Sequence, residues 1–395
     1  MDPRIFSNAS PNWARSKFWG SSFVADAFGK VIRKAGSDED VLVAKLDLSQ
    51  NARIREGWRF TKNRRPDTYA RITLPVQPEI PIRDGFRMPA EWESHSATWL
   101  AWPEDRVTFP KRLERVRNQY LNIIDLISRG ENVNIAVRDT ETRTAVRSAL
   151  KARGVNLRAI YFHVWDYADV WFRDYGPTFL LNDHTGEVST VQWRFNAWGN
   201  KYPTLLKDAH VPYSISERLG LTLYRPNIVL EGGAIEVNGK GAALTTEQCL
   251  LNPNRNPGMT KEKMEAYLRD YLGVRRVVWL KGGIAGDDTD GHIDNLARFV
   301  GPSTVVCAWE SNEKDENYAP LEDNFRRLSS EFQVIKLPMP LAAYDVFRGQ
   351  KRRLASSYAN FYISNASVLV PVYGSKTDNE AIRILQDAFR DRKVV

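Results

Sequence analysis

The chain of 395 residues contains only two cysteines, Cys249 and Cys307. Two thiols supply neither the paired spacing of a disulfide-stabilised secreted domain nor a cysteine-based metal cluster. No apolar run approaches the ~20 residues that a membrane helix needs, and the N-terminus lacks the basic and apolar segments of a signal peptide. These absences argue against a disulfide scaffold and a membrane-spanning protein, and they predict a cytoplasmic protein with no membrane partner.

Positive charge is in modest excess and unevenly spread. The formal net charge is +8, and residues 1–85 hold 15 Lys and Arg against 10 Asp and Glu, so the other 310 residues are close to neutral. A nucleic-acid-binding protein would cluster basic residues with stacking aromatics. The densest basic run, Arg59–Pro66, is short, and such runs commonly face solvent. We therefore expect no nucleic-acid partner.

Proline and glycine divide the chain into two parts. Residues 74–85 contain three prolines and Gly85, which is typical of a linker. The preceding residues, 1–73, predict a hairpin within 18–32, a buried strand at 41–48 and a short helix at 49–60, which is too little structure to bury a core alone. A second and larger domain is predicted at residues 86–395.

One unit recurs in this larger domain, a helical stretch followed by a strand. Five such units with intervening hairpins, at 178–182 and 189–195, predict a closed and repeated α/β array. The units are Arg112–Arg129 with Val133–Val137, Thr140–Arg153 with Leu157–Phe162, Thr260–Leu272 with Val274–Leu280, Pro320–Glu331 with Phe332–Leu337, and Asp378–Phe389 with Arg392–Val395. Because the chain stops inside the last predicted strand, we expect the domain to be incomplete at its C-terminus.

Acidic side chains gather around one histidine between Gly286 and Phe299. On an extended segment His292 and Asp294 would face the same space, and Asp174 and Glu231 are further acids in aromatic or glycine-rich surroundings. Carboxylates held together repel one another unless a positive group lies among them, and that group could be a metal ion or an organic cation.

A guanidinium fits these acids better than a metal ion does. The segment Asp287–Gly291 resembles the start of an EF-hand, but Arg298 stands where the bidentate glutamate would be. One histidine with no second His or Cys nearby in the sequence is a poor zinc site. A planar guanidinium pairs with carboxylates through two parallel hydrogen bonds. We therefore predict no metal site and no cofactor, and a small-molecule guanidine as substrate.

Five long motifs resemble those of the agmatine deiminase and Porphyromonas-type peptidyl-arginine deiminase family, within the pentein superfamily. The resemblance covers residues 86–395 in the family's order and implies a five-fold α/β propeller. The motifs are MPAEWESHSATWLAWP, VWFRDYGPTF, EGGAIEVNGKGAALTTEQCLLNPNRNP, DTDGHIDNLARF and SYANFYISNASVLVPVYG.

The resemblance also implies roles for individual residues. Asp174 and Asp294 would hold the guanidinium, and Glu231 would pair with His292, the general acid and base. Trp171 would form a wall of the pocket, and Asp288 would meet the distal amine of agmatine. Members of this family often self-associate, so the resemblance leaves a homo-oligomer open.

The family's nucleophile is a cysteine in a glycine-rich segment after the last strand, and the sequence departs from the family at this point. That position would lie beyond Val395. Cys249 and Cys307 are predicted to lie in structural, apolar surroundings, where a thiol is a poor nucleophile, so neither is assigned as catalytic. We therefore expect this chain to be inactive, either as a piece of an active enzyme or as a guanidinium-binding protein without turnover.

Residues 1–73 resemble the C-terminal end of a nitrilase-family amidase, N-carbamoylputrescine amidase. The segments that carry the resemblance are FWGSSFV with its following turn, VLVAKLDL and NRRPDTY. Agmatine deiminases make N-carbamoylputrescine, which that amidase hydrolyses to putrescine, so a fusion would join consecutive steps of putrescine biosynthesis. This favours agmatine as substrate, with peptidyl-arginine as the open alternative.

Overall fold

The computed structural model describes residues 22–26, 29–36, 41–46, 79–347 and 350–395. The chain divides into two compact units, Met1–Pro78 and Glu79–Val395. In the first unit, β1 (Phe23–Ala25) pairs with β2 (Val31–Lys34) in an antiparallel hairpin. Across the described residues, none of the helices combines the length and the apolar character that crossing a bilayer requires.

The first unit differs from its prediction at one described segment. Residues 41–46, predicted to lie in a buried strand, form no strand, and Val41 is 84% exposed. A run of alternating valines becomes a strand only when a neighbouring strand and a covering surface are available. The helix predicted at 49–60 lies outside the described residues. The boundary at residue 73 stays a prediction, and η3 (Pro81–Asp84), inside the predicted linker, belongs to the second unit.

The described residues of the second unit form five sheets of three or four strands and one two-stranded hairpin. In four of the sheets an antiparallel pair is followed by a parallel strand; the sheet β4-β5-β6 is parallel throughout. The sheets are β3 (Phe86–Arg87), β7 (Thr178–Asn182), β8 (Val188–Val191) and β9 (Leu223–Tyr224); β4 (Ala97–Ala101), β5 (Asn132–Val137) and β6 (Ile160–Val164); β10 (Glu236–Val237), β11 (Ala242–Thr246) and β12 (Arg276–Leu280); β13 (Ala297–Gly301), β14 (Thr304–Trp309) and β15 (Gln333–Pro338); and β18 (Tyr362–Ile363), β19 (Ser367–Leu369) and β20 (Lys393–Val394).

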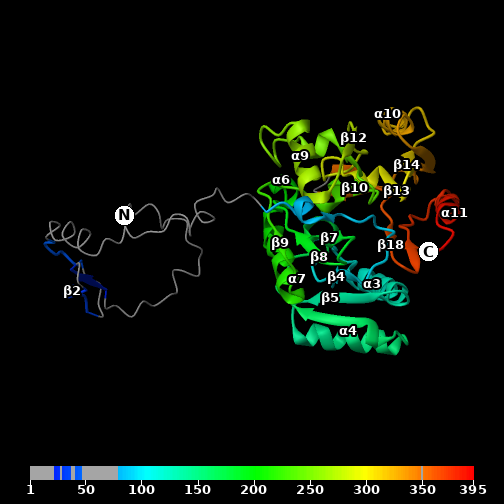
Figure 1. Cartoon of the computed structure of the whole chain (residues 1–395). Helices are drawn as coiled ribbons and strands as arrows, with labels where there is room; N and C mark the ends of the chain where they lie inside the picture. The colour runs from blue at the N-terminus through cyan, green and yellow to red at the C-terminus, as the bar shows by residue number, and fades with distance from the viewer. Residues whose placement is uncertain (1–21, 27–28, 37–40, 47–78, 348–349) are drawn as a thin grey trace. The chain divides into compact units, whose positions relative to one another are not determined.

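The longer helices lie around the outside of this unit, with the strands inside (Figure 1). They are α3 (Leu113–Ser128), α4 (Thr140–Ala152), α7 (Val211–Leu219), α9 (Lys261–Leu272), α10 (Tyr318–Ser329) and α11 (Asp378–Ala388). Capping residues in the sequence determine where several of these helices begin and end. Thr260 caps α9 by accepting a hydrogen bond from Lys263 N, and Gly273 ends that helix with a left-handed φ of 72°.

All five predicted helix–strand units are present, and the mixed α/β class is confirmed. The units do not correspond one to one with the sheets, however, because α3–β5 and α4–β6 both belong to the β4-β5-β6 sheet. The four-stranded sheet receives its parallel strand from α7 and β9, which the prediction missed because β9 has only two residues. The five-fold propeller arrangement stays a prediction.

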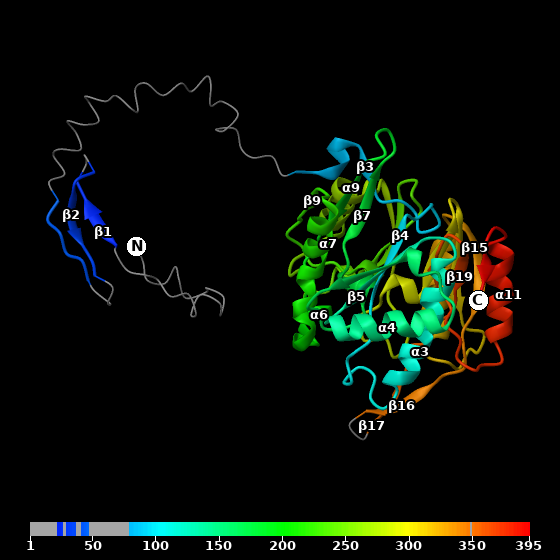
Figure 2. The ribbon, with the colours of Figure 1, turned by 90° about the horizontal axis from the view of Figure 1, so that it is seen from below.

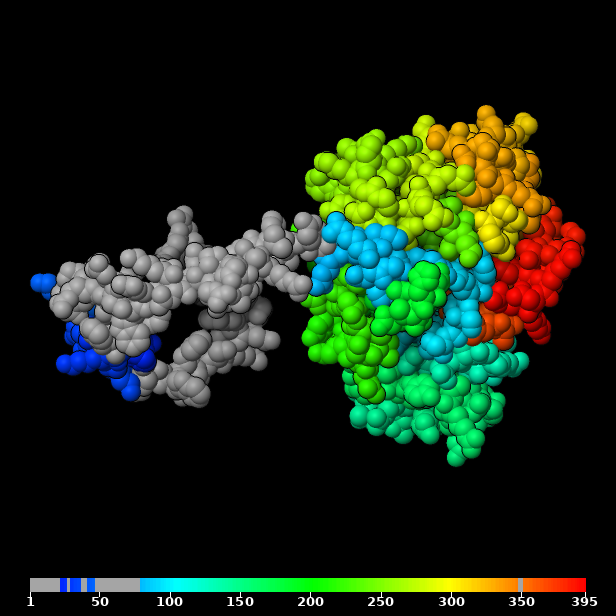
Figure 3. Space-filling model, in the orientation of Figure 1, coloured from blue at the N-terminus to red at the C-terminus, as the bar shows by residue number. Residues whose placement is uncertain are grey.

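The first residues of the second unit cross the middle of the face shown in Figure 3, between segments from distant parts of the chain. Glu91 in this stretch forms ion pairs with Arg173 and with Arg298. Arg298, which is 1% exposed, also pairs with Glu236 at 2.8 Å and donates to Phe361 O at 2.6 Å. Through these contacts Arg298 and Glu91 join five segments of the chain beside the site described below.

The remaining hairpin, β16 (Tyr344–Phe347) with β17 (Gln350–Arg353), extends away from the sheets at the lower edge of Figure 2. Arg353 anchors its end through ion pairs of 2.9 Å with Asp315 and Glu316. The segment after it returns to the sheet that begins with β18.

Candidate active site

Asp174 lies in the one-turn helix α5 (Phe172–Tyr175), and both of its carboxylate oxygens are held. Oδ1 accepts a hydrogen bond from Gly233 N, and Oδ2 accepts one from the indole Nε1 of Trp198, each at 3.0 Å. The side chain is buried. These two hydrogen-bond donors therefore fix the orientation of the Asp174 carboxylate.

Trp198 reaches Asp174 from a strained turn. The residues of α6 (Ala197–Asn200) all have positive φ, and these include the non-glycine residues Ala197 at 52°, Trp198 at 54° and Asn200 at 63°. This left-handed conformation costs about 1–2 kcal/mol for each such residue. Strain of this kind persists where surrounding contacts enforce it, commonly at functional sites. Here it directs an indole N–H at the carboxylate.

The loop before His292 is organised by Asp287. Its Oδ1 accepts hydrogen bonds from Thr289 N and Oγ1, and its Oδ2 accepts from Gly291 N at 3.1 Å and His292 N at 3.2 Å. Both carboxylate oxygens of Asp287, the first acid of the EF-hand-like segment, therefore accept hydrogen bonds from the protein. The loop leads into η7 (Ile293–Asn295), in which Asp294 is buried.

Asp174, His292 and Asp294 converge on the space above Gly233. His292 Nδ1 lies 3.6 Å from Asp174 Oδ1. A Cβ placed on Gly233 would come within 2.6 Å of both of these atoms and within 2.7 Å of Asp294 Oδ2. Only a residue without a side chain leaves this space open.

The electrostatics of this space suit a cation. Burial lowers the pKa of His292, but the charge of Asp174, the interaction with Cys249 and the charge of Asp294 together outweigh it, and the net pKa is well above the ordinary value. Burial raises the pKa of Asp294 to about 6, with the neighbouring Asp174 adding to the shift and His292 opposing it. Two carboxylates confined beside one imidazole favour a positive group between them.

Glu231, at the start of η6 (Gly232–Ala234), lies on another side of His292. Its Oε1 accepts from Arg255 Nε at 2.8 Å, and both side chains are fully buried. Arg255 also pairs with Asp290 through Nη1. Cys249, in α8 (Glu247–Leu250), completes a group in which one ligand-type atom each of Glu231, Cys249 and His292 lie within 4.8 Å of one another.

Trp171 and Asp288 lie farther from the centre and are exposed. The ring of Trp171 meets that of Trp198 edge to face, with 6.2 Å between centroids. Asp288 accepts a hydrogen bond from the hydroxyl of Tyr202, and its backbone carbonyl accepts from Lys201 Nζ at 2.6 Å. Tyr202 packs against Trp198 at 5.8 Å, so an aromatic path joins Asp288 to Asp174.

The structure thus brings Asp174, Glu231, His292 and Asp294 together around one histidine, with Trp171 and Asp288 at the edge. Their catalytic roles stay predictions. Glu231 is close to His292 without a hydrogen bond to it: its Oε1 accepts from Arg255, and its Oε2 has no partner among the described residues. Cys307 lies elsewhere, in β14, and is fully buried.

Sequence reasoning missed three contributors to this site. Arg255, Trp198 and Cys249 all contact it from segments remote in the sequence. Arg255 belongs to the NPNRNP stretch within a recognised motif, and that motif was the available signal for it. Cys249 belongs to the same motif, whereas nothing local marks Trp198 as a neighbour of Asp174.

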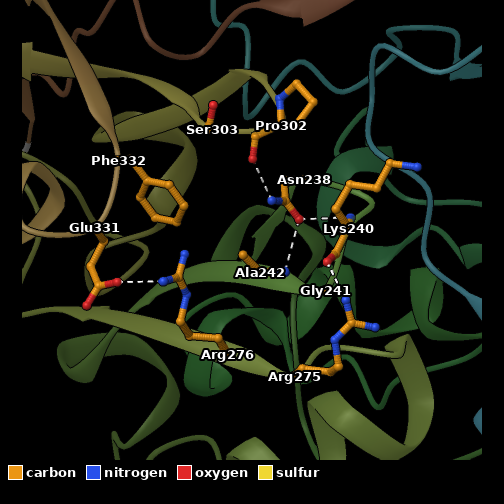
Figure 4. A pocket seen from close by; sticks show the side chains of 10 residues that line it. All are labelled: Asn238, Lys240, Gly241, Ala242, Arg275, Arg276, Pro302, Ser303, Glu331 and Phe332. Carbon is orange, nitrogen blue, oxygen red and sulfur yellow. Dashed lines mark hydrogen bonds and ion pairs between the residues drawn. The ribbon is translucent and has the colours of Figure 1, made fainter.

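A separate surface pocket of about 290 Å³ lies at the beginning of β11 and β12 and is shown in Figure 4. Lys240, Arg275 and Arg276 contribute its cationic side chains, and Arg276 pairs with Glu331 at 2.6 Å. The acid cluster is near the other end of β11, where Thr246 Oγ1 binds Gly291 O at 2.7 Å. The pocket shares no residue with that cluster.

Acids gathered around an imidazole suit a hydrolase that acts on guanidino carbon–nitrogen bonds. Residues 87–395 match the family model described as Porphyromonas-type peptidyl-arginine deiminase, and the chain belongs to this family.

Similar proteins bear this out in sequence and in structure. The agmatine deiminase of Pseudomonas putida is 37% identical over 341 residues, which cover 80% of this chain and 91% of that protein. The solved agmatine deiminase of Enterococcus faecalis has a TM-score of 0.73 at 34% identity, covering 81% of this chain and 92% of that one. A cysteine-to-serine variant of the C. jejuni agmatine deiminase with substrate bound has a TM-score of 0.70 at 30% identity, covering 78% of this chain and 90% of that one.

Proposed function

We propose that the second unit binds agmatine and is built for hydrolysis of its guanidinium group to N-carbamoylputrescine and ammonia. The convergence of Asp174, His292 and Asp294 on the open space above Gly233 is the observation that carries the proposal. The relatives at 36–37% identity that are named agmatine deiminases support the choice of substrate.

In the proposed reaction a cysteine thiolate attacks the guanidinium carbon while Asp174 and Asp294 balance the positive charge. His292, kept protonated by its neighbours, donates a proton to the departing ammonia. Water that is deprotonated by the same imidazole then attacks the S-alkylthiouronium carbon, and the thiolate leaves with the urea-type product released. The chemistry requires no metal ion or organic cofactor.

We further propose that neither cysteine of the chain is the nucleophile. Burial raises the pKa of Cys307 to about 12 and also raises the pKa of Cys249. Both side chains are fully buried. A buried thiol with a raised pKa supplies little thiolate, so the chain of 395 residues should bind agmatine without turning it over.

Asp288 is the proposed partner of the distal amine. The hydroxyl of Tyr202 holds its carboxylate at the exposed edge of the site. An amine at this position would gain an ion pair, whereas the carbonyl of a peptide-bound arginine would meet a like partial charge. This favours agmatine over peptidyl-arginine.

Calorimetry on the full chain tests the proposal. Agmatine should bind, and Asp174→Asn should weaken binding by about 10- to 100-fold, the equivalent of a charged hydrogen-bonding partner worth about 1.5–3 kcal/mol. Asp166→Asn, which alters an exposed acid paired with Lys207, should change nothing. A blocked arginine dipeptide should bind more weakly than agmatine.

Ammonia release should stay at the level of the blank. Release that persists in Cys249→Ser and Cys307→Ser would show that another group attacks the guanidinium carbon. Release lost in one of these variants would identify that thiol as the nucleophile. A folded chain that binds agmatine no better than the Asp174→Asn variant does would overturn the assignment of the site.

We also propose that residues 1–73 are related to the C-terminal end of N-carbamoylputrescine amidase. The strand β1 overlaps the end of the FWGSSFV segment, and β2 follows the turn after it, so the hairpin agrees with the one that the resemblance implies. The resembling segments contain no catalytic residue of that amidase. Removing residues 1–73 should therefore leave agmatine affinity unchanged, and a loss of binding would argue for a role of the first unit in the site.

A further inference from the structure

A carboxylate, a thiol and an imidazole lie close together at His292. Glu231, Cys249 and His292 come from η6, α8 and η7, which are far apart in sequence, and one oxygen, the sulfur and one ring nitrogen lie within 4.8 Å of one another. All three residues are buried, with 0%, 0% and 2% of their surfaces exposed. Such a mixed set of donors is uncommon unless it serves a purpose.

One of these donors carries a buried atom without a partner. Glu231 Oε2 makes no hydrogen bond with any described residue, and the other oxygen of Glu231 accepts from Arg255. The His292 ring has a side-chain hydrogen bond with the Cys249 thiol, which helps to raise the pKa of His292, and its Nδ1 faces Asp174 at 3.6 Å. Buried polar atoms are nearly always paired, so the unpaired oxygen of Glu231, in a group with Cys249 and His292, has room for a ligand.

We propose that Glu231, Cys249 and His292 form a binding site for a thiophilic divalent cation of the Zn²⁺ class. Carboxylate oxygen, thiolate sulfur and imidazole nitrogen are the zinc ligands of proteins, and three of them leave a fourth tetrahedral position open. Tetrahedral zinc separates its ligand atoms by about 3.5 Å, given bonds of about 2.0–2.3 Å. The donor atoms lie within 4.8 Å of one another, so they need to draw together by no more than about 1.3 Å.

Binding balances charge without disturbing the neighbouring ion pairs. The Cys249 thiol and the His292 imidazolium each release a proton to water, and the Cys249 thiolate and the Glu231 carboxylate then neutralise the two positive charges of the cation. Arg255 keeps Glu231 Oε1 and Asp290 as partners. A second group, Asp174 with His292 and Asp294, also lies within 4.8 Å. Its Asp174 oxygens already accept from Gly233 and Trp198, and it lacks sulfur, so it is the poorer zinc site.

The cation would block proton transfer by His292 and would not serve as a cofactor. This consequence rests on the proposed function, in which His292 transfers protons. A metal ion on Nε2 takes the place of a proton on the imidazole and couples the ring to Glu231 and Cys249, so the ring can no longer alternate between its protonation states. The metal binding itself does not depend on agmatine being the substrate.

Cobalt absorption on the full chain tests the site without any substrate. Co²⁺ added after chelator treatment should bind with one equivalent and produce a thiolate-to-cobalt charge-transfer band in the near ultraviolet, which Zn²⁺ abolishes. Cys249→Ser should lose the band and bind at least roughly tenfold more weakly. Cys307→Ser, which changes an equally buried thiol in β14, should keep both the band and the affinity.

The outcomes separate the alternatives. A band that survives in folded Cys249→Ser, or no band in the unaltered chain, overturns the proposal. Far-ultraviolet circular dichroism checks folding, and Glu231→Gln provides a second variant that should weaken Co²⁺ binding by a similar factor if Cys249→Ser does not fold. Failure of agmatine to bind would overturn the proposed function and leave the cobalt result standing.

Discussion

Replacing Arg298 by methionine should remove much of the stability of the second unit. Methionine matches the length of the aliphatic part but leaves Glu236 and Glu91 without their shared cation. Arg298 pairs with the first at 2.8 Å and the second at 3.0 Å, and its guanidinium lies 4.8 Å from the centre of the Phe361 ring. Glu91 keeps its ion pair with Arg173, so the loss of a charged partner affects Glu236 more strongly than Glu91.

The magnitude follows from burial. Removing one partner of a buried ion pair costs about 3–5 kcal/mol, because a charge is left in a region that water does not reach. An isolated exposed pair is worth at most about 1 kcal/mol. Domains are stabilised by about 5–15 kcal/mol in total, so this one substitution should remove a large part of the unfolding free energy.

Urea unfolding followed by tryptophan fluorescence measures the effect. Arg269→Met is the matched control, because Arg269 is 58% exposed and pairs only with its neighbour Asp270; it should cost less than about 1 kcal/mol. The loss in Arg298→Met should be smaller at pH 5 than at pH 7, because the stranded carboxylates can take up protons. Equal unfolding free energies for the two variants would refute the reasoning.

Three further predictions concern the site. Gly233→Ala should abolish detectable agmatine binding in calorimetry while the fold persists, since its Cβ would occupy the space between the site side chains; Gly301→Ala, at an open turn, should bind normally. Tyr202→Phe removes the hydroxyl that holds Asp288, and agmatine affinity should fall about fivefold, or about 1 kcal/mol, whereas unchanged affinity would exclude that contact. The pKa of Asp294 is raised from 3.8 to about 6, so the folded state retains a proton that the unfolded chain has lost. The unfolding free energy should therefore decrease, relative to Asp294→Asn, as pH rises from about 4 to about 6, and a parallel pH profile for the two proteins would contradict the shift.

The sequence by itself determined the local elements and the family. Helix periodicity with its caps, such as Thr260 and Gly273 around α9, depends on residues within one or two turns. Long motifs identified the family because each is too long and specific to match by chance, and several of them contain residues of the site. For the same reason Asp174, Glu231, His292 and Asp294 could be named as one set.

Only the tertiary structure decided which sheet each unit joins and what surrounds His292. Two predicted units share the β4-β5-β6 sheet, because strand pairing depends on contacts between residues far apart in the chain. Cys249 precedes His292 by a whole helix–strand unit, and no local pattern relates them. Trp198 reaches Asp174 through a left-handed turn that local preferences oppose and the packed site enforces. Where neighbours in space set the conformation, no pattern among neighbours in sequence can predict it.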